Sequence, residues 1–282
     1  MDKLVLVFRE LRRVLKKTGT FWLNIGDSYS GSSKGSANYP QSTKNYLQAT
    51  NKGMIGKSKT TKVKYDTKRK ELLMIPARLA IALSKDGWYM RQDIIWHKPN
   101  PMPESVKDRC TKSYEHIFLL AKSPKYYFNA EAISEDVAES TIKRMNQDIK
   151  NQKGSYRQPG KTNGPMKACA PRYRGNKYTK DPETFYRTKS GDIYKYKPKR
   201  NKRDVWTIST RPYKGAHFAT FPIELPETCL LAGCPNGGIA IDIFMGSGTT
   251  GVAAKKLNLD FIGIELNEKY CEMAKKRIKG YL

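Results

Sequence analysis

The chain has 282 residues, with 53 lysines and arginines against 26 aspartates and glutamates, and its formal net charge is +27. This length holds one α/β domain with an insertion, and so large a positive excess favours a polyanionic partner, most often nucleic acid. No apolar run reaches the roughly 18 residues that cross a bilayer, and no signal-peptide pattern is present, so we expect no membrane partner.

The cysteines and histidines argue against a disulfide framework and against a metal site. The five cysteines are odd in number and form no Cys-x-x-Cys pair, and the three histidines are scattered. Cys229 and Cys234 flank an apolar stretch and are expected to be core thiols, as in a reducing, cytoplasmic environment. With possible ligands so dispersed, we expect no metal site.

The first part of the chain predicts a helix, a strand and a long loop. Apolar side chains recur at helical spacing over residues 4–15. Residues 20–25 follow as a strand that ends in Gly26-Asp27-Ser28-Tyr29. Residues 31–70 are rich in Gly, Ser, Thr, Asn and Lys. Such a segment cannot bury enough surface to offset its ordering entropy, so we expect a mobile loop.

Three further elements complete this part of the chain. The helical pattern resumes over residues 71–85, with Pro76 in its early part. Residues 88–96 predict a strand that leads into a proline-rich turn over 97–103. Residues 115–122 predict another strand.

Residues 134–204 differ in character from the segments on either side. Between 141 and 210 there are 19 Lys or Arg against 5 Asp or Glu, interleaved with 6 Tyr. Basic side chains contact phosphates, and tyrosine rings stack on bases or sugars, so this segment is a candidate nucleic-acid contact. An unstructured basic linker is the alternative that composition leaves open. The core pattern returns at residues 205–207.

The most informative stretch lies near the C-terminal end, where a buried strand at 239–243 runs into a glycine turn and a helix. Glycines 246, 248 and 251 fit G-x-G-x-x-G, and a second apolar run at 261–264 ends on Glu265. Strand, glycine turn, helix, strand and acid in this order indicate a nucleotide-type cofactor site. A glycine turn that only packs a helix on a sheet is the alternative.

Asp242 narrows the choice of cofactor. It ends the first strand just before the turn, where a carboxylate would repel a pyrophosphate bound at the helix N-terminus. The carboxylate would suit a positively charged cofactor, such as S-adenosylmethionine with its sulfonium and ammonium groups. Because only 17 residues follow Glu265, the remaining strands of the sheet must come from earlier in the chain.

At these residues the sequence resembles a known family. Residues 242–250 resemble the D-P-F-x-G-S-G-T-T cofactor motif of the amino-group DNA methyltransferases, with Ile243 in place of the proline. Residues 217–222 are similar to the segment that folds an aromatic ring over the cofactor, and 264–267 to the end of the second strand. The resemblance implies that S-adenosylmethionine is the cofactor. It also implies that the binding residues are Phe218, Thr220, Asp242, Phe244, Gly246, Ser247, Gly248, Thr249, Thr250, Glu265 and Asn267.

The resemblance is to the permuted subgroup, whose cofactor motif lies C-terminal, and it covers residues 8–277. It implies an α/β fold, a Rossmann-like S-adenosylmethionine-dependent methyltransferase sheet with an inserted basic target-recognition region. The expected parts are a catalytic-side half (1–133, with the mobile loop 31–70), the target-recognition insert (134–204) and the cofactor-binding half (205–282). Such enzymes, typical of restriction-modification systems, act on double-stranded DNA at specific sites. They transfer a methyl group to an exocyclic amine, cytosine N4 or adenine N6, of a flipped base.

The family's catalytic motif is not found in this sequence. It consists of a Ser, Asp or Asn, two prolines and an aromatic residue, and the chain has no Pro-Pro pair. In the family the motif precedes the first helix, so we expect an N-terminally truncated chain that lacks the strand between 239–243 and 21–25. Those strands would then pair directly, or another polypeptide would fill the gap. Asp27 and Tyr29, at a strand end, are the remaining candidates for catalysis.

The turn after the strand at 88–96 carries the other candidate site residues. Trp96, His97 and Pro99 are candidates for lining the flipped-base pocket, and the alternative is that Trp96 packs in the core and His97 caps a strand. Candidate contacts to the DNA backbone are Lys98, Asn100 and Arg109.

Two rival functions remain open. One is a catalytically inactive remnant that binds DNA or the cofactor without transferring a methyl group. The other is RNA methylation, which would use the same cofactor half. The sequence predicts neither the choice between adenine and cytosine nor the recognition sequence or oligomeric state.

Overall fold

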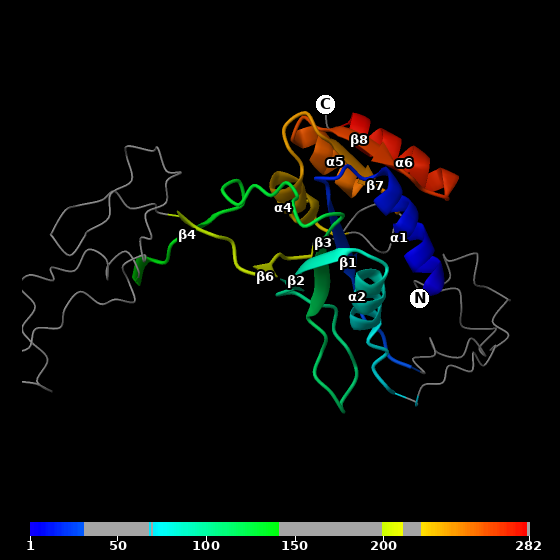
Figure 1. Ribbon diagram of the computed structural model, residues 1–282. Helices are drawn as coiled ribbons and strands as arrows, with labels where there is room; N and C mark the ends of the chain where they lie inside the picture. The colour runs from blue at the N-terminus through cyan, green and yellow to red at the C-terminus, as the bar shows by residue number, and fades with distance from the viewer. Residues whose placement is uncertain (31–67, 69, 141–198, 211–220, 281–282) are drawn as a thin grey trace, which may run out of the picture. The chain divides into compact units, whose positions relative to one another are not determined.

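The computed structural model describes residues 1–30, 68, 70–140, 199–210 and 221–280 (Figure 1). Almost all of the expected loop 31–70, most of the basic insert, and the predicted cofactor residues Phe218 and Thr220 lie outside the described residues. The chain divides into two units. One comprises Met1–Phe128 with Asp204–Leu282, and the other comprises Asn129–Arg203.

The first unit contains the helices and strands that the sequence predicts, in the predicted order, together with α4, α6 and the short strand β6, which were not predicted as elements. They are α1 (Asp2–Val14), β1 (Thr20–Ile25), α2 (Ile75–Lys85), β2 (Tyr89–His97), β3 (Tyr114–Ala121), β6 (Val205–Thr207), α4 (Glu224–Gly233), β7 (Ile239–Asp242), α5 (Thr249–Lys256), β8 (Asp260–Gly263) and α6 (Glu268–Lys279).

One boundary differs clearly from the prediction. Helix α2 begins at Ile75, four residues later than expected. Leu72 forms a β-bridge with Tyr29, and Met74 has a left-handed backbone with φ of 52°. These residues are therefore tied to the end of β1, and the helix starts only where Pro76 can occupy its first turn.

The larger sheet has the order β1-β3-β2-β6. Strand β3 pairs antiparallel with both β1 and β2, and the short β6 pairs parallel with β2 through Ile95–His97. Helices α1 and α2 cover one face, and α4 covers the other (Figure 1).

The two faces of β3 show why this sheet is buried on both sides. Phe118 and Leu120 pack among α1 and α2, whereas Ile117 packs with Trp206 and with Cys229 of α4. Alternate side chains of a strand point to opposite faces, so a continuous apolar run satisfies both layers. Burial raises the pKa of the Cys229 thiol, so this cysteine stays protonated and is a core residue.

Strands β7 and β8 form a separate parallel pair that α5 and α6 accompany. Small residues allow these elements to approach closely. A Cβ on Gly251 would lie 2.4 Å from Ile278 Cδ1 and 2.7 Å from Phe261 Cε1. Ala253 and Ala254 of α5 and Ala274 of α6 are fully buried. The βαβ unit predicted from the glycine pattern is thus present.

Strands β1 and β7 do not pair with each other, so direct pairing, the first of the two alternatives that the sequence left, is wrong. They nevertheless lie against one apolar layer, because Phe21 of β1 and Ile241 of β7 both pack on the cluster that contains Phe8. Thr20 Oγ1, at the start of β1, donates a hydrogen bond to the carbonyl of Gly233, shortly before β7 (3.2 Å). Among the described residues, each strand therefore has one edge without a partner strand.

The second unit contributes a small basic ladder to the described part of the chain. Strand β4 (Glu135–Asp136) pairs antiparallel with β5 (Lys199–Arg200). Glu135 forms ion pairs with Arg200, Lys202 and Arg203, at 3.5, 3.7 and 3.2 Å. One carboxylate thus binds three basic side chains where the basic insert ends.

In the ranges that the structure describes, none of the helices has the length and apolarity needed to cross a membrane. Nor does this part of the chain gather three or more His, Cys, Asp or Glu side chains in a metal-binding group.

We predict that the free edges of β1 and β7 exchange their amide hydrogens rapidly. Amides that bond to a neighbouring strand are protected, and those at an open edge are not. Alternate amides of β1 and β7 should exchange at least roughly tenfold faster than those of β3, which has a strand on each side. Hydrogen exchange followed by NMR measures this, and uniform protection along β1 would contradict the open edge.

Candidate functional site

The glycine turn after β7 has a backbone that only glycine adopts without strain. Gly246 and Gly248 have φ of 52° and 79°, a region that side-chain-bearing residues rarely occupy. A Cβ on Gly248 would also lie 2.9 Å from the Cβ of Ala274. Gly248 is the N-cap of α5, so the turn brings the amide groups at the start of this helix to the strand end.

Two carboxylates, one at the end of each parallel strand, hold this turn. Asp242 Oδ1 accepts from the backbone N–H of Phe244 (3.0 Å), and its Oδ2 accepts from Thr250 Oγ1 (2.5 Å). Glu265 Oε2 accepts from the backbone N–H of Gly246 (2.9 Å). The acids predicted to bind the cofactor therefore also fix the loop that would surround it.

Arg277 braces the same turn from α6. Its Nη1 lies 3.1 Å from Ser247 Oγ, 3.3 Å from the Ser247 carbonyl and 2.9 Å from Thr249 Oγ1. Ser247 and Thr249, both predicted to bind the cofactor, are buried in this structure, and their side chains bond to Arg277. The sequence motif includes Ser247 and Thr249 but not Arg277, whose role depends on how α6 packs.

Large apolar side chains stand exposed beside the two carboxylates. Phe244 is 60% exposed and Leu266 is fully exposed, and each follows the end of one of the parallel strands. Acids next to exposed apolar surface fit a ligand with a cationic end and a flat apolar ring, as S-adenosylmethionine has. Asn267, also predicted to bind the cofactor, caps α6 by accepting from the N–H of Lys269 (3.0 Å).

The residues predicted for the base pocket lie at the carboxyl end of β2, and one prediction is wrong. Trp96 is only 2% exposed, and its Nε1 donates to the Ile208 carbonyl (2.8 Å). It is a core residue, the alternative that the sequence left open. His97 is half-buried, with Nδ1 3.2 Å from Thr207 Oγ1, and Pro99 is exposed.

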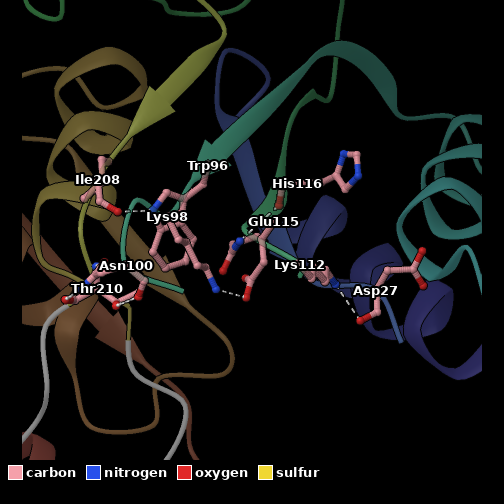
Figure 2. A network of polar contacts seen from close by, with 10 residues as sticks. Asp27, Trp96, Lys98, Asn100, Lys112, Glu115, His116, Ile208 and Thr210 are labelled. Carbon is pink, nitrogen blue, oxygen red and sulfur yellow. Dashed lines mark hydrogen bonds and ion pairs between the residues drawn. The ribbon is translucent and has the colours of Figure 1, made fainter. Parts of the chain in front are cut away.

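The predicted DNA-backbone residues form a polar network around these strand ends (Figure 2). Lys98 Nζ lies 2.5 Å from Glu115 Oε1 and 4.3 Å from the centre of the Trp96 ring. Asn100 exchanges hydrogen bonds with Thr210, in both directions at 2.9 Å.

Arg109 belongs to the same rim of the sheet. Its Nη1 lies 2.5 Å from Glu104, and its guanidinium lies 4.2 Å from the centre of the Tyr29 ring. The hydrogen bond from Arg109 holds the pKa of Glu104 below its ordinary value, so this pair stays ionised near neutral pH.

Asp27, one of the two remaining candidates for catalysis, makes hydrogen bonds that hold the fold. Its Oδ1 accepts from the backbone N–H groups of Ser28 (2.8 Å) and Ile75 (3.0 Å), and its carbonyl accepts from Lys112 Nζ (2.8 Å). The carboxylate thus joins the end of β1 to the start of α2. Tyr29 lies beneath the Arg109 guanidinium, so both candidates already have protein partners.

Comparison with known proteins decides which family has this arrangement. Residues 2–276 match the N6/N4 methyltransferase family, described as DNA methylase. The chain belongs to this family of DNA methyltransferases. It is 38% identical to the type II methyltransferase M.SmaI of Serratia marcescens, over 98% of this chain and 72% of the relative. It is 37% identical to M.Cfr9I of Citrobacter freundii, over 99% and 71%.

Solved structures agree on the fold of this methyltransferase. The PvuII DNA methyltransferase (cytosine-N4-specific) covers 99% of this chain and 77% of its own, with a TM-score of 0.53 and 14% identity. TTHA0409 of Thermus thermophilus, complexed with S-adenosyl-L-methionine, covers 99% and 76%, with a TM-score of 0.51 and 17% identity. By family the chain is an enzyme that uses S-adenosylmethionine to methylate an exocyclic amine of DNA.

We predict that Arg277→Ala weakens the binding of S-adenosylmethionine by roughly tenfold. The substitution leaves buried oxygens of Ser247 and Thr249 without their donor, which costs about 1–3 kcal/mol and loosens the turn. Lys276→Ala is the matched control, because it removes the same charge from an exposed position on the same helix. Isothermal titration calorimetry, at a temperature where both variants are folded, measures their affinities for S-adenosylmethionine. Equal affinities of the two variants would contradict the bracing role of Arg277.

Proposed function

We propose that the turn between β7 and α5 holds S-adenosylmethionine and that the polar rim at the ends of β1 and β2 receives the DNA. The observation that carries this proposal is the pair Asp242 and Glu265. Both acids stand at the ends of parallel strands and bond the glycine turn between them. A crevice at the carboxyl ends of parallel strands is the usual ligand position in such sheets.

The acids would act on different parts of the cofactor. A carboxylate offers about four acceptor sites, so an oxygen that already accepts from the turn can accept a further hydrogen bond from a ligand. Glu265 is placed to accept hydrogen bonds from the ribose hydroxyls, and the negative charge of Asp242 favours the cationic end. When bound, the cofactor supplies an electrophilic methyl group. The chain's own contribution is to orient it and to exclude the anionic competitors that a bare helix N-terminus would attract.

The DNA side of the proposal uses the rim residues as contacts to phosphates. An exocyclic amine lies inside the duplex, so the base must leave the stack before it reaches the cofactor. Lys98, Asn100 and Arg109 remain our proposed backbone contacts, together with His97 and Pro99 beside the base. Their present partners, such as Glu115 and Glu104, hold the Lys98 and Arg109 side chains in place at the rim.

The biological setting follows from the relatives. The relatives compared above are named type II methyltransferases, so we propose that this chain modifies specific sites in a restriction-modification system. Its DNA substrate would place it in the cytoplasm. Cytosine N4 and adenine N6 present the same amine chemistry, and the proposal covers both.

We also propose that the sheet accepts a further strand between β1 and β7, from an adjoining or separate polypeptide. Three observations support this: the two strands do not pair, each has an open edge among the described residues, and both pack on the apolar cluster around Phe8. A strand at this position would end between Asp27 and Asp242. Its last residues could then supply the amine acceptors that neither Asp27 nor Tyr29 is free to provide.

The central test is methyl transfer to unmethylated DNA with labelled S-adenosylmethionine. Asp242→Asn should reduce affinity for the cofactor by at least roughly tenfold and abolish transfer, because it removes the charge and disturbs the turn. Asp260→Asn is the matched control, since that acid is exposed on the neighbouring strand. Unchanged affinity in Asp242→Asn would contradict the site.

The same assay separates the rival functions. Transfer to duplex DNA but not to RNA supports the proposed substrate, and the reverse supports RNA methylation. Binding of cofactor and DNA without any transfer supports an inactive chain. The inactive chain is then co-expressed with a peptide that can form the further strand and that carries Asp-Pro-Pro-Tyr. Methyl transfer in this sample would support the proposal that the catalytic residues come from a strand at the open edges.

A further inference from the structure

The loop between β2 and β3 presents a large apolar side chain to solvent. It extends from Lys98 to Ser113, away from the strands (Figure 1). Met102, with 84% of its surface exposed, stands between Pro101 and Pro103. An unbranched apolar side chain exposed to this degree adds little folding stability, because little of it is buried. Whether it serves a partner is decided by how the loop holds it and by the charge around it.

Hydrogen bonds hold both ends of the loop, so the backbone that carries Met102 is restrained. On the outgoing side, the N–H of Lys98 donates to the Ser113 carbonyl (2.7 Å), and Asn100 is clasped to Thr210 (Figure 2). On the returning side, Lys112 Nζ donates to the Asp27 carbonyl (2.8 Å).

Internal bonds and prolines stiffen the part of the loop between these ends. Glu104 accepts both from Arg109 Nη1 (2.5 Å) and from the N–H of Lys112 (3.4 Å). The prolines on either side of Met102 restrict the backbone further. A loop backbone restricted in this way loses little conformational entropy on binding.

The charge around Met102 indicates what the partner is. The loop carries four basic residues, Lys98, Lys107, Arg109 and Lys112, against two acids. Glu104 is paired with Arg109, Asp108 with Lys70 (2.6 Å), and Lys98 with Glu115 of β3. With these partners counted, five basic residues stand against three acids, an excess of two positive charges. The hydrogen bond from Lys70 keeps the pKa of Asp108 below its ordinary value, so the pairing persists at neutral pH. An apolar side chain can contact the stacked bases of a nucleic acid, and the basic residues around it can contact the phosphates on either side. We therefore take nucleic acid as the partner.

We propose that Met102 is a wedge that enters the DNA base stack at the gap left by the flipped target base. This rests on the proposed function, in which the target leaves the duplex at the rim formed by the same loop. A flipped base leaves its neighbours unstacked, at a cost of a few kcal/mol. An apolar side chain inserted at that step replaces part of the lost contact, as Met and Pro wedges do in other DNA-binding proteins.

The test compares binding to an intact short duplex and to the same duplex with one abasic site, measured by fluorescence anisotropy at fixed salt. An abasic site offers the gap in advance, so the wild-type chain should prefer that duplex by roughly tenfold. Met102→Ala should prefer the abasic duplex clearly less than the wild type does, because only the contribution of the wedge is lost, and Met102→Leu, which keeps most of the volume, should retain the preference. Val106→Ala, at a 40% exposed position on the same loop, is the matched control and should behave as wild type.

The outcomes separate the wedge from the proposed function. No preference in the wild type, or an undiminished preference in Met102→Ala, would overturn the wedge even if the chain methylates DNA. A preference that depends on Met102 supports the wedge even if methyl transfer is not detected, and in that case the proposed function alone would fail. Thermal melts of the three variants should match the wild type, because both positions are exposed.

Discussion

The bonds from Asp242 and Glu265 to the glycine turn are the constraint on which the site depends. A loop with two left-handed glycines has many other conformations in isolation, and the two carboxylates select one by accepting its N–H and hydroxyl groups. Because each acid ends one of two parallel strands, pairing of β7 with β8 sets the distance between them. Arg277 adds a third attachment from behind. The negative charge that we propose for a cationic cofactor therefore also shapes the glycine turn.

The first unit is built from two sheets that share one apolar layer. The larger sheet positions the basic rim, and the β7–β8 pair positions the cofactor turn. Packing of Phe21 and Ile241 on the cluster around Phe8 brings the two sheets together without strand pairing. This division has a functional consequence. Under the proposed function, the cofactor turn belongs to the β7–β8 pair, whereas the amine would react between the two sheets, where the open edges of the described strands lie.

The sequence predicted those features that depend on neighbours along the chain, and it failed where distant segments decide. Strand, glycine turn and helix at 239–256 follow from local pattern, so this unit could be predicted from the sequence. The burial of Trp96 could not, since it depends on pairing with β6 and a bond to Ile208, 112 residues away. Helix α2 starts late because Leu72 pairs with Tyr29. No sequence motif predicts the hydrogen bonds of Arg277 to Ser247 and Thr249, because they form only when α6 packs beside α5.

The measurement that tests the central claim most directly is an NMR titration of the chain with S-adenosylhomocysteine, followed at the backbone amides. The account predicts that shifts concentrate at residues 242–250 and 264–267, with the amides of the larger sheet little affected. Saturable shifts centred elsewhere, or no shifts at millimolar ligand in folded protein, would contradict a cofactor site built on the two carboxylates.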